Sequence, residues 1–329
     1  MPLTTESLSN LCIDASFPNL QAYFLQSIPK GCFPDFLYHY TKSDILPLIC
    51  GRRGRMLATN GCYFKDYHEI VYGATRFLDA LTKVNQVPQS IILKIKEALY
   101  TLHDGKCKAM PWITSFSCRN DSARLWHDYT SRDGGYCIVF RYKGLLEFVK
   151  WFMARRGCYS ESNEGSLFIM PCIYEGKHDI EKYLQAYVKD ISNNLAHEHN
   201  ANYVLAHAIV AGVCVKKAMY QFEHEWRMIL IPSARRLITD DVLILNNKPR
   251  LSLGFEKWLD DMRRLIAGIL ISPHGNHQKL RANAKKLVRD YIVQNNNSRP
   301  KIEISGLPTE YDNLITYWDK SQQAYELHT

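Results

Sequence analysis

Two glutamates separated by one residue are the side chains of this chain best placed to do chemistry. Glu223 and Glu225 stand in QFEHEWRMILIP, at the start of an apolar run, Trp226–Ile231, that predicts a buried strand. Side chains two apart on a strand share a face, so the sequence sets two like charges together. A carboxylate fixed at the rim of a sheet can orient a substrate hydroxyl or stabilise a developing cation. The alternative is that both are solvated, or that one pairs with Arg227 or a nearby lysine.

Two other predicted strands carry polar side chains. In the stretch TSFS, Ser115 and Ser117 share one face, and hydroxyls on a face expected to be core need hydrogen-bond partners. Those partners are either backbone groups or a bound polar ligand. His39, between two tyrosines in FLYHYT, poses the same question, because a strand histidine is more often a packed or surface residue than a ligand contact.

Metal, phosphate-loop and thiol chemistry are not favoured by the sequence. His197, His199 and His207 match none of the common zinc spacings, and the first two would point apart on a helix, so we expect no metal. No Gly-rich loop of the Walker or dinucleotide type occurs. Cys118 lies near His127 without a nucleophile turn, and burial explains most free cysteines.

Composition is that of an ordinary soluble globular protein, with 329 residues, 46% hydrophobic and 22% charged. No apolar run reaches membrane-spanning length and no Sec signal precedes the domain, so we expect a cytoplasmic protein without membrane contact. Ten cysteines without a CxxC pair indicate reduced thiols. The net charge of +8 comes from dispersed basic pairs, which suit a nucleotide or nucleic-acid partner or simply a solvated surface.

Predicted strands and helices alternate along the chain, which indicates one mixed α+β domain at 36–306 between a lead-in at 1–35 and a tail at 307–329. Ser43 and either Asn120 or Asp121 are expected to cap helices. We expect strands at 36–41, 55–59, 112–117, 136–142, 166–174, 223–232, 266–272 and 301–304, and helices at 43–50, 68–84, 89–103, 121–129, 143–156, within 178–218 and at 278–294.

Five segments, taken together and in order, resemble a bacterial domain-of-unknown-function family, number 2971, over about residues 36–306. They read LYHYT, MLATNGCYFKDYHE, WITSFSCRNDSARLWHDYTSRDGGYCIVF, KKAMYQFEHEWRMILI and ILISPHGNHQKLRANAKKLV. The chain departs from the family pattern at Lys65 and Tyr67, which replace asparagine and proline, and at Ser272, where glycine is usual. The family's closing motif is reduced to SGLPTEY.

The order of these parts is similar to the ADP-ribosyltransferase fold, and this resemblance implies a split mixed β-sheet core with helical insertions. It implies that NAD is a substrate. Glu225 would then bind the ribose and stabilise its positive charge, and Glu223 would act toward the acceptor. The remaining implied contacts are His39 and Tyr40 at the adenosine-side ribose, Ser115 and Ser117 as support on the middle strand, and Tyr63 or Phe64 stacked on nicotinamide.

The resemblance therefore implies an NAD-dependent ADP-ribosyltransferase, acting as a toxin, an effector delivered without a Sec signal, or a defence protein. Its acceptor would be nucleic acid or protein, and an antitoxin or immunity protein would be a further partner. Two other functions stay open: a non-catalytic nucleotide- or nucleic-acid-binding module on the same fold, and an NAD glycohydrolase with water as the acceptor. Fold resemblance alone does not establish chemistry.

Overall fold

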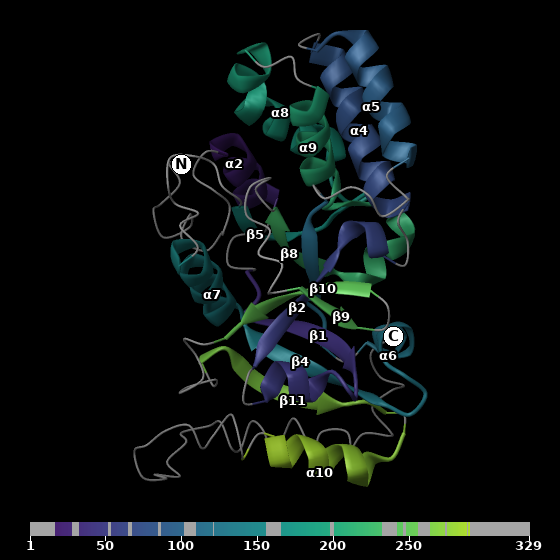
Figure 1. Cartoon of the computed structure of the whole chain (residues 1–329), viewed down its shortest axis with the longest axis vertical. Coiled ribbons are helices and arrows are strands. Elements are labelled where there is room, and N and C mark those ends of the chain that lie inside the picture. The colour runs from purple at the N-terminus through teal and green to yellow at the C-terminus, as the bar shows by residue number, and fades with distance from the viewer. Residues whose placement is uncertain are drawn as a thin grey trace. The chain divides into compact units, whose positions relative to one another are not determined.

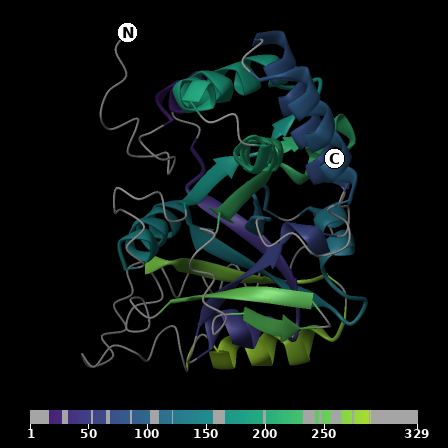
Figure 2. The ribbon, with the colours of Figure 1, turned by 45° about the horizontal axis from the view of Figure 1, so that its top comes forward.

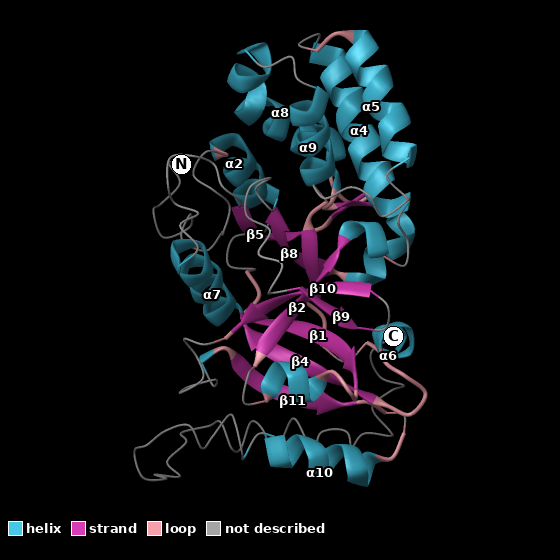
Figure 3. Ribbon diagram, viewed as in Figure 1, coloured by secondary structure: helices cyan, strands magenta, loops and turns pink. Residues whose placement is uncertain are grey.

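The expected mixed α+β class is confirmed by the computed structural model, whose main sheet is mostly antiparallel (Figure 3). The structure describes residues 17–27, 33–51, 54–64, 68–84, 87–101, 110–120, 122–155, 166–197, 201–231, 242–245, 248–255, 264–273, 275–287 and 289. They group into two compact units (Figure 1). The first unit comprises Met1–Phe33, Ala58–Ser115 and Val149–Leu251, and the second comprises Pro34–Leu57, Phe116–Phe148 and Ser252–Thr329. The single domain at 36–306 stays a prediction.

The second unit is built on three long antiparallel strands with β4 in the middle. They are β1 (Phe36–Lys42), β4 (Gly135–Arg141) and β11 (Ile266–Ile271), and the end of β3 (Trp112–Ser117) pairs with β1 at Tyr38↔Ser117. All six residues of β11 are buried, as expected for a continuous apolar run such as IAGILI. The helices α3 (Leu46–Cys50), α6 (Ala123–Tyr129) and α10 (His277–Leu287) belong to this unit, and α7 (Tyr142–Arg155) begins in it.

Helices dominate the first unit and share one hydrophobic core. They are α2 (Pro18–Ser27), α4 (His68–Val84), α5 (Gln89–Thr101), α8 (Ile180–His197) and α9 (Ala201–Gly212). The helices α4 and α9 lie side by side (Figure 2). A Cβ atom on Gly73 would stand 2.0 Å from the carbonyl oxygen of Gly212, so only glycine permits this approach. Gly73 follows Glu69 by four residues, so the contact lies one helical turn from Glu69 in α4.

The strands of the first unit position the candidate site. β5 (Ser166–Pro171) pairs antiparallel with β8 (Glu225–Ile231), which also pairs with β3. The short strands β6 (Ile173–Tyr174) and β7 (Val215–Lys216) run parallel, and the 3₁₀ helix η3 (Ala218–Glu223) connects β7 to β8. β2 (Arg55–Asn60), η1 (Gly61–Tyr63), β9 (Val242–Leu245) and β10 (Lys248–Gly254) complete the elements.

Most expected elements are found within a few residues of their predicted bounds, and the differences arise at helix starts and strand breaks. Ser43 caps no helix, because α3 begins at Leu46 after Ile45. The cap of α6 is Ser122, which accepts from the Leu125 N–H, and not Asn120 or Asp121. The strand expected at 166–174 is divided between β5 and β6. The strand expected at 301–304 and the tail lie outside the described residues.

Among the helices that the structure describes, none is both long and apolar enough to cross a membrane.

Candidate ion-cluster site

The two glutamates do not lie on one strand, so the expected shared strand face is wrong. Glu225 is the first residue of β8, whereas Glu223 is the last residue of η3. Between them His224 adopts a left-handed conformation with φ 42°, which reverses the chain direction locally. The two side chains nevertheless converge, because both contact the ammonium of Lys216 on β7, the strand that precedes η3 in the chain.

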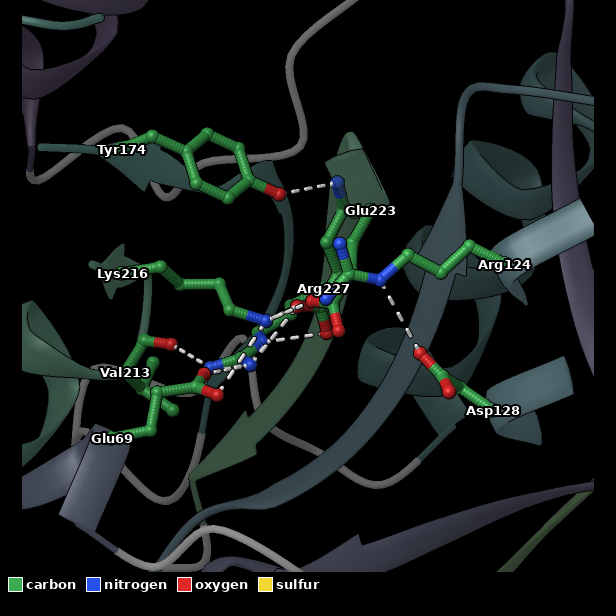
Figure 4. A network of polar contacts seen from close by, with 9 residues as sticks. Glu69, Arg124, Asp128, Tyr174, Val213, Lys216, Glu223 and Arg227 are labelled. Carbon is green, nitrogen blue, oxygen red and sulfur yellow. Dashed lines mark hydrogen bonds and ion pairs between the residues drawn. The ribbon is translucent and has the colours of Figure 1, made fainter. Parts of the chain in front are cut away.

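Lys216 is the centre of a buried ion cluster formed by five residues: Glu69, Lys216, Glu223, Glu225 and Arg227 (Figure 4). Its Nζ donates to Glu225 Oε2 at 2.5 Å and to Glu223 Oε2, and lies 3.5 Å from Glu69 Oε2. No member of the ion cluster is more than 8% exposed. Buried charges of this kind are stable only when they are paired.

Arg227 supplies the second cation of the ion cluster. Its Nε donates to Glu225 Oε1 at 2.8 Å and its Nη2 donates to Glu225 Oε2 at 3.0 Å. The same Nη2 bonds Glu69, and Nη1 bonds the carbonyl oxygen of Val213. The guanidinium therefore ties β8 to α4 and to the turn after α9. Pairing of a glutamate with Arg227 or a nearby lysine, the alternative read from the residues alone, is confirmed.

The electrostatics favour the charged forms of Lys216, Glu225 and Arg227. Burial raises the pKa of the Glu225 carboxyl, but Arg227 and Lys216 outweigh burial and hold this pKa well below its usual range. Burial lowers the pKa of Lys216 and of Arg227, and Glu225 and Glu69 more than reverse that effect for both cations. The carboxylate of Glu225 is thus a permanent anion, held in place before any ligand arrives.

Neighbouring groups fix the start of β8 further. The N–H of Glu225 donates to the Tyr174 hydroxyl at 2.7 Å, and its carbonyl oxygen accepts from the Cys172 N–H at 2.8 Å. Two half-buried aromatic rings lie against the cations: the Phe64 ring centroid is 5.5 Å from Arg227 Cζ, and the Tyr220 centroid is 5.0 Å from Lys216 Nζ. Next to them, η3 exposes Met219, which is 64% exposed.

Of the other predicted residues in the first unit, Phe64 contacts the ion cluster, because its ring lies against the Arg227 guanidinium. Tyr63 is half-buried in η1, and its carbonyl oxygen accepts from Lys248 Nζ at 3.4 Å. Ser115 is half-buried on β3. The roles expected for Tyr63 and Ser115 stay predictions.

The remaining predicted residues belong to the second unit and have local partners there. The His39 ring packs against Phe116, with ring centroids 5.8 Å apart. The Tyr40 hydroxyl donates to the Arg119 carbonyl oxygen at 3.2 Å and accepts from the Ser122 N–H at 3.1 Å. Ser117 is buried, and its Oγ accepts from the Arg119 N–H at 3.0 Å. The serine hydroxyl therefore has the backbone partner that a structural role requires.

Sequence reasoning missed Lys216, Glu69, Tyr174 and Tyr220. Lys216 had a partial signal, because a lysine near the glutamates was one expected partner. Glu69 ends the motif MLATNGCYFKDYHE, but its contact with Arg227, 158 positions away, had no signal in the sequence. Among the described residues, no group of three or more His, Cys, Asp or Glu side chains is arranged to hold a metal ion.

Comparison with known proteins gives one match. The model of the family DUF2971, described as a protein family of unknown function, matches residues 125–228, about a third of the chain. The matched stretch holds four members of the ion cluster, from Lys216 to Arg227, and the match supports the resemblance drawn from the motifs. No curated protein matches the chain, and no solved structure does.

Proposed function

We propose that this chain is an ADP-ribosyltransferase-like enzyme that uses NAD as a substrate. The observation that carries the proposal is the convergence of Glu223 and Glu225 on the single ammonium of Lys216, at the start of β8. The order of the motifs along the chain, with His39 before the serine strand and the serine strand before Glu225, gives the proposal its fold-level support.

The chemistry of NAD cleavage calls for a fixed anion. Breaking the bond between nicotinamide and ribose develops positive charge on the ribose, as in other glycoside transfers. A carboxylate held in position before the reaction stabilises that charge without reorganisation during the reaction. The pKa of Glu225 is held low by its two cations, so in the proposal this carboxylate stays charged and helps to hold Lys216, which contacts Glu223.

In the proposal the two glutamates divide the work differently from the expectation. Both carboxylate oxygens of Glu225 are bonded to Arg227, and Oε2 is bonded to Lys216 as well. A substrate would have to displace a cation to reach Glu225, so we assign it a positioning role. Glu223 ends η3, on the turn before the strand, and in the proposal it is the catalytic carboxylate.

Aromatic rings beside the ion cluster suit a flat, electron-poor ligand such as nicotinamide. Phe64 and Tyr220 are both half-buried and lie against the two cations, so in the proposal they flank the nicotinamide ring. The ribose contacts that the resemblance implies for His39 and Tyr40 stay predictions, and the proposed acceptor is nucleic acid or protein. A toxin, effector or defence role follows from the same proposal.

Incubation with NAD labelled in the adenosine half, together with separate pools of DNA, RNA and protein, tests the proposal. We expect release of nicotinamide and transfer of label to one pool. Release without transfer would replace the proposal with an NAD glycohydrolase. Absence of release, together with nucleic-acid binding that weakens steeply with salt, would replace it with a non-catalytic binding module.

A further inference from the structure

We infer that Lys216 is the positioning residue of this site, holding Glu223 and Glu225 together from one fixed point. The catalytic consequence rests on the proposed function, but the positioning itself does not. Three carboxylates meet this ammonium: those of Glu223 and Glu225 in hydrogen bonds and that of Glu69 at 3.5 Å. A lysine ammonium has three N–H donors, so its capacity matches the three carboxylates around it.

The backbone around Lys216 leaves its side chain little freedom. Lys216 pairs with Tyr174 in the parallel register of β7 and β6, and its carbonyl oxygen accepts from the Glu175 N–H at 2.9 Å. Two residues earlier on each strand, the Cys214 carbonyl oxygen accepts from the Ile173 N–H at 2.7 Å. The side chain is 2% exposed, with the Tyr220 ring over its Nζ.

The two cations of the ion cluster have different tasks because of their shapes. Arg227 offers a planar fork, which grips Glu225 through Nε and Nη2. Lys216 offers a compact point charge, which can approach carboxylates arriving from different directions. Lys216 contacts both Glu223 and Glu225 through its one ammonium group. We therefore expect loss of Lys216 to loosen the placement of the two glutamates relative to each other, even if Arg227 keeps its contacts with Glu225.

The chain offers a matched control in the next residue. Lys217 is exposed, and its Nζ lies 5.5 Å from the Tyr72 ring centroid, outside the ion cluster. Lys216→Met and Lys217→Met remove the same charge from neighbouring positions. We expect Lys216→Met to slow nicotinamide release by about 100-fold, the size of effect seen when one transition-state contact is lost. Lys217→Met should stay within about twofold of the wild type, as surface substitutions usually do.

The pH profile separates positioning from a merely structural role. Because Lys216 helps to keep Glu225 ionised, the acid limb of the residual activity of Lys216→Met should move to higher pH. Lys216→Arg keeps the charge, so its acid limb should stay where the wild type has it, even at a lower rate. An unshifted acid limb in Lys216→Met, with activity near the wild type, would overturn the inference.

A second variant covers the case in which Lys216→Met does not fold. Adding Glu69→Gln removes one charge of each sign from the ion cluster, which limits the cost of an unpaired buried charge. The pH dependence of unfolding is then measured without NAD. We expect acid unfolding of the variant to begin at higher pH than in the wild type, and identical unfolding curves would overturn the inference. If the wild type releases no nicotinamide but the unfolding curve of the variant is shifted, the proposed function is refuted. The assignment of Lys216 as positioning residue then still holds.

Discussion

Arg227 lies two residues after Glu225 on β8, and its Nε donates to Glu225 Oε1 at 2.8 Å. The two side chains meet because alternate residues of a strand share a face. The same rule fails for Glu223, which lies outside the strand, beyond the left-handed His224. The contact between Glu225 and Arg227 is thus a direct consequence of the strand period. The contact between Glu223 and Lys216 follows instead from the turn at His224.

Removing the charge of Glu225 should destabilise the fold. Glu225→Gln leaves the buried cations Lys216 and Arg227 short of a counterion, and breaking a buried pair of this kind costs about 3–5 kcal/mol in the free energy of unfolding. Urea unfolding measures the loss. Glu181→Gln serves as the control, because Glu181 forms its ion pairs with Lys83 and Arg76 at the surface and should cost about 1 kcal/mol or less. Equal costs for the two variants would show that the ion cluster contributes no special stability.

The stability of the wild type should fall in acid because Glu225 becomes protonated. The pKa of Glu225 in the folded state lies below the ordinary value of 4.5. Its ionised carboxylate therefore contributes its full stabilisation above pH 4.5, and this stabilisation is lost as the pH falls below that value. Each such group can steepen the fall by up to about 1.4 kcal/mol per pH unit. As the pH is lowered below 4.5, the measured free energy of unfolding should fall less steeply for Glu225→Gln than for the wild type. Parallel curves would argue against this ionisation.

His207 should act in a separate and higher pH window. Burial lowers the pKa of His207 from 6.5 to about 4, and its Nδ1 lies 3.0 Å from the Tyr187 hydroxyl. Between these two values the unfolded state binds a proton that the folded state does not, so stability falls as the pH drops. The full loss amounts to roughly 3 kcal/mol. His207→Gln should flatten unfolding curves between pH 6.5 and pH 4, and an unchanged slope there would contradict the assignment.

Phe116 should matter for stability far more than its neighbour Ser115. Phe116 is 2% exposed, with ring centroids 5.6 Å from Phe140 and 5.8 Å from His39. Truncating a large core aromatic leaves a cavity, so Phe116→Ala should cost about 3–5 kcal/mol. Ser115→Ala, at a half-buried position, should change the free energy of unfolding by less than about 1 kcal/mol. Chemical denaturation of both variants checks the contrast, which a similar cost for the two would refute.

Local patterns predicted the elements of this fold well where one period dominates. The helix at 68–84 has the predicted bounds, as does the strand Trp112–Ser117, because their apolar spacing is regular over many residues. The residue that caps a helix was harder to predict. Ser122, Asp121 and Asn120 are all good N-cap residues, and the backbone at the first turn of α6 decides between them.

The site was only half visible in the sequence because its contacts join distant parts of the chain. The motif EHEWR indicates both glutamates and Arg227 from the sequence alone. Arg227 and Glu69 meet across 158 positions of sequence, next to the close approach of α4 and α9 at Gly73 and Gly212, and no local pattern predicts either contact. The sequence also gave no reason to expect that both glutamates would be buried.

The proposed function depends on Glu223 as the catalytic carboxylate, so the rate of nicotinamide release by Glu223→Gln tests it most directly. Glutamine preserves the size of the side chain and removes its charge, and Glu181→Gln again supplies an exposed control. With both variants shown to be folded, we predict that Glu223→Gln releases nicotinamide about 100-fold more slowly than the wild type, and Glu181→Gln at the wild-type rate. A folded Glu223→Gln that releases nicotinamide as fast as the wild type would contradict the proposal.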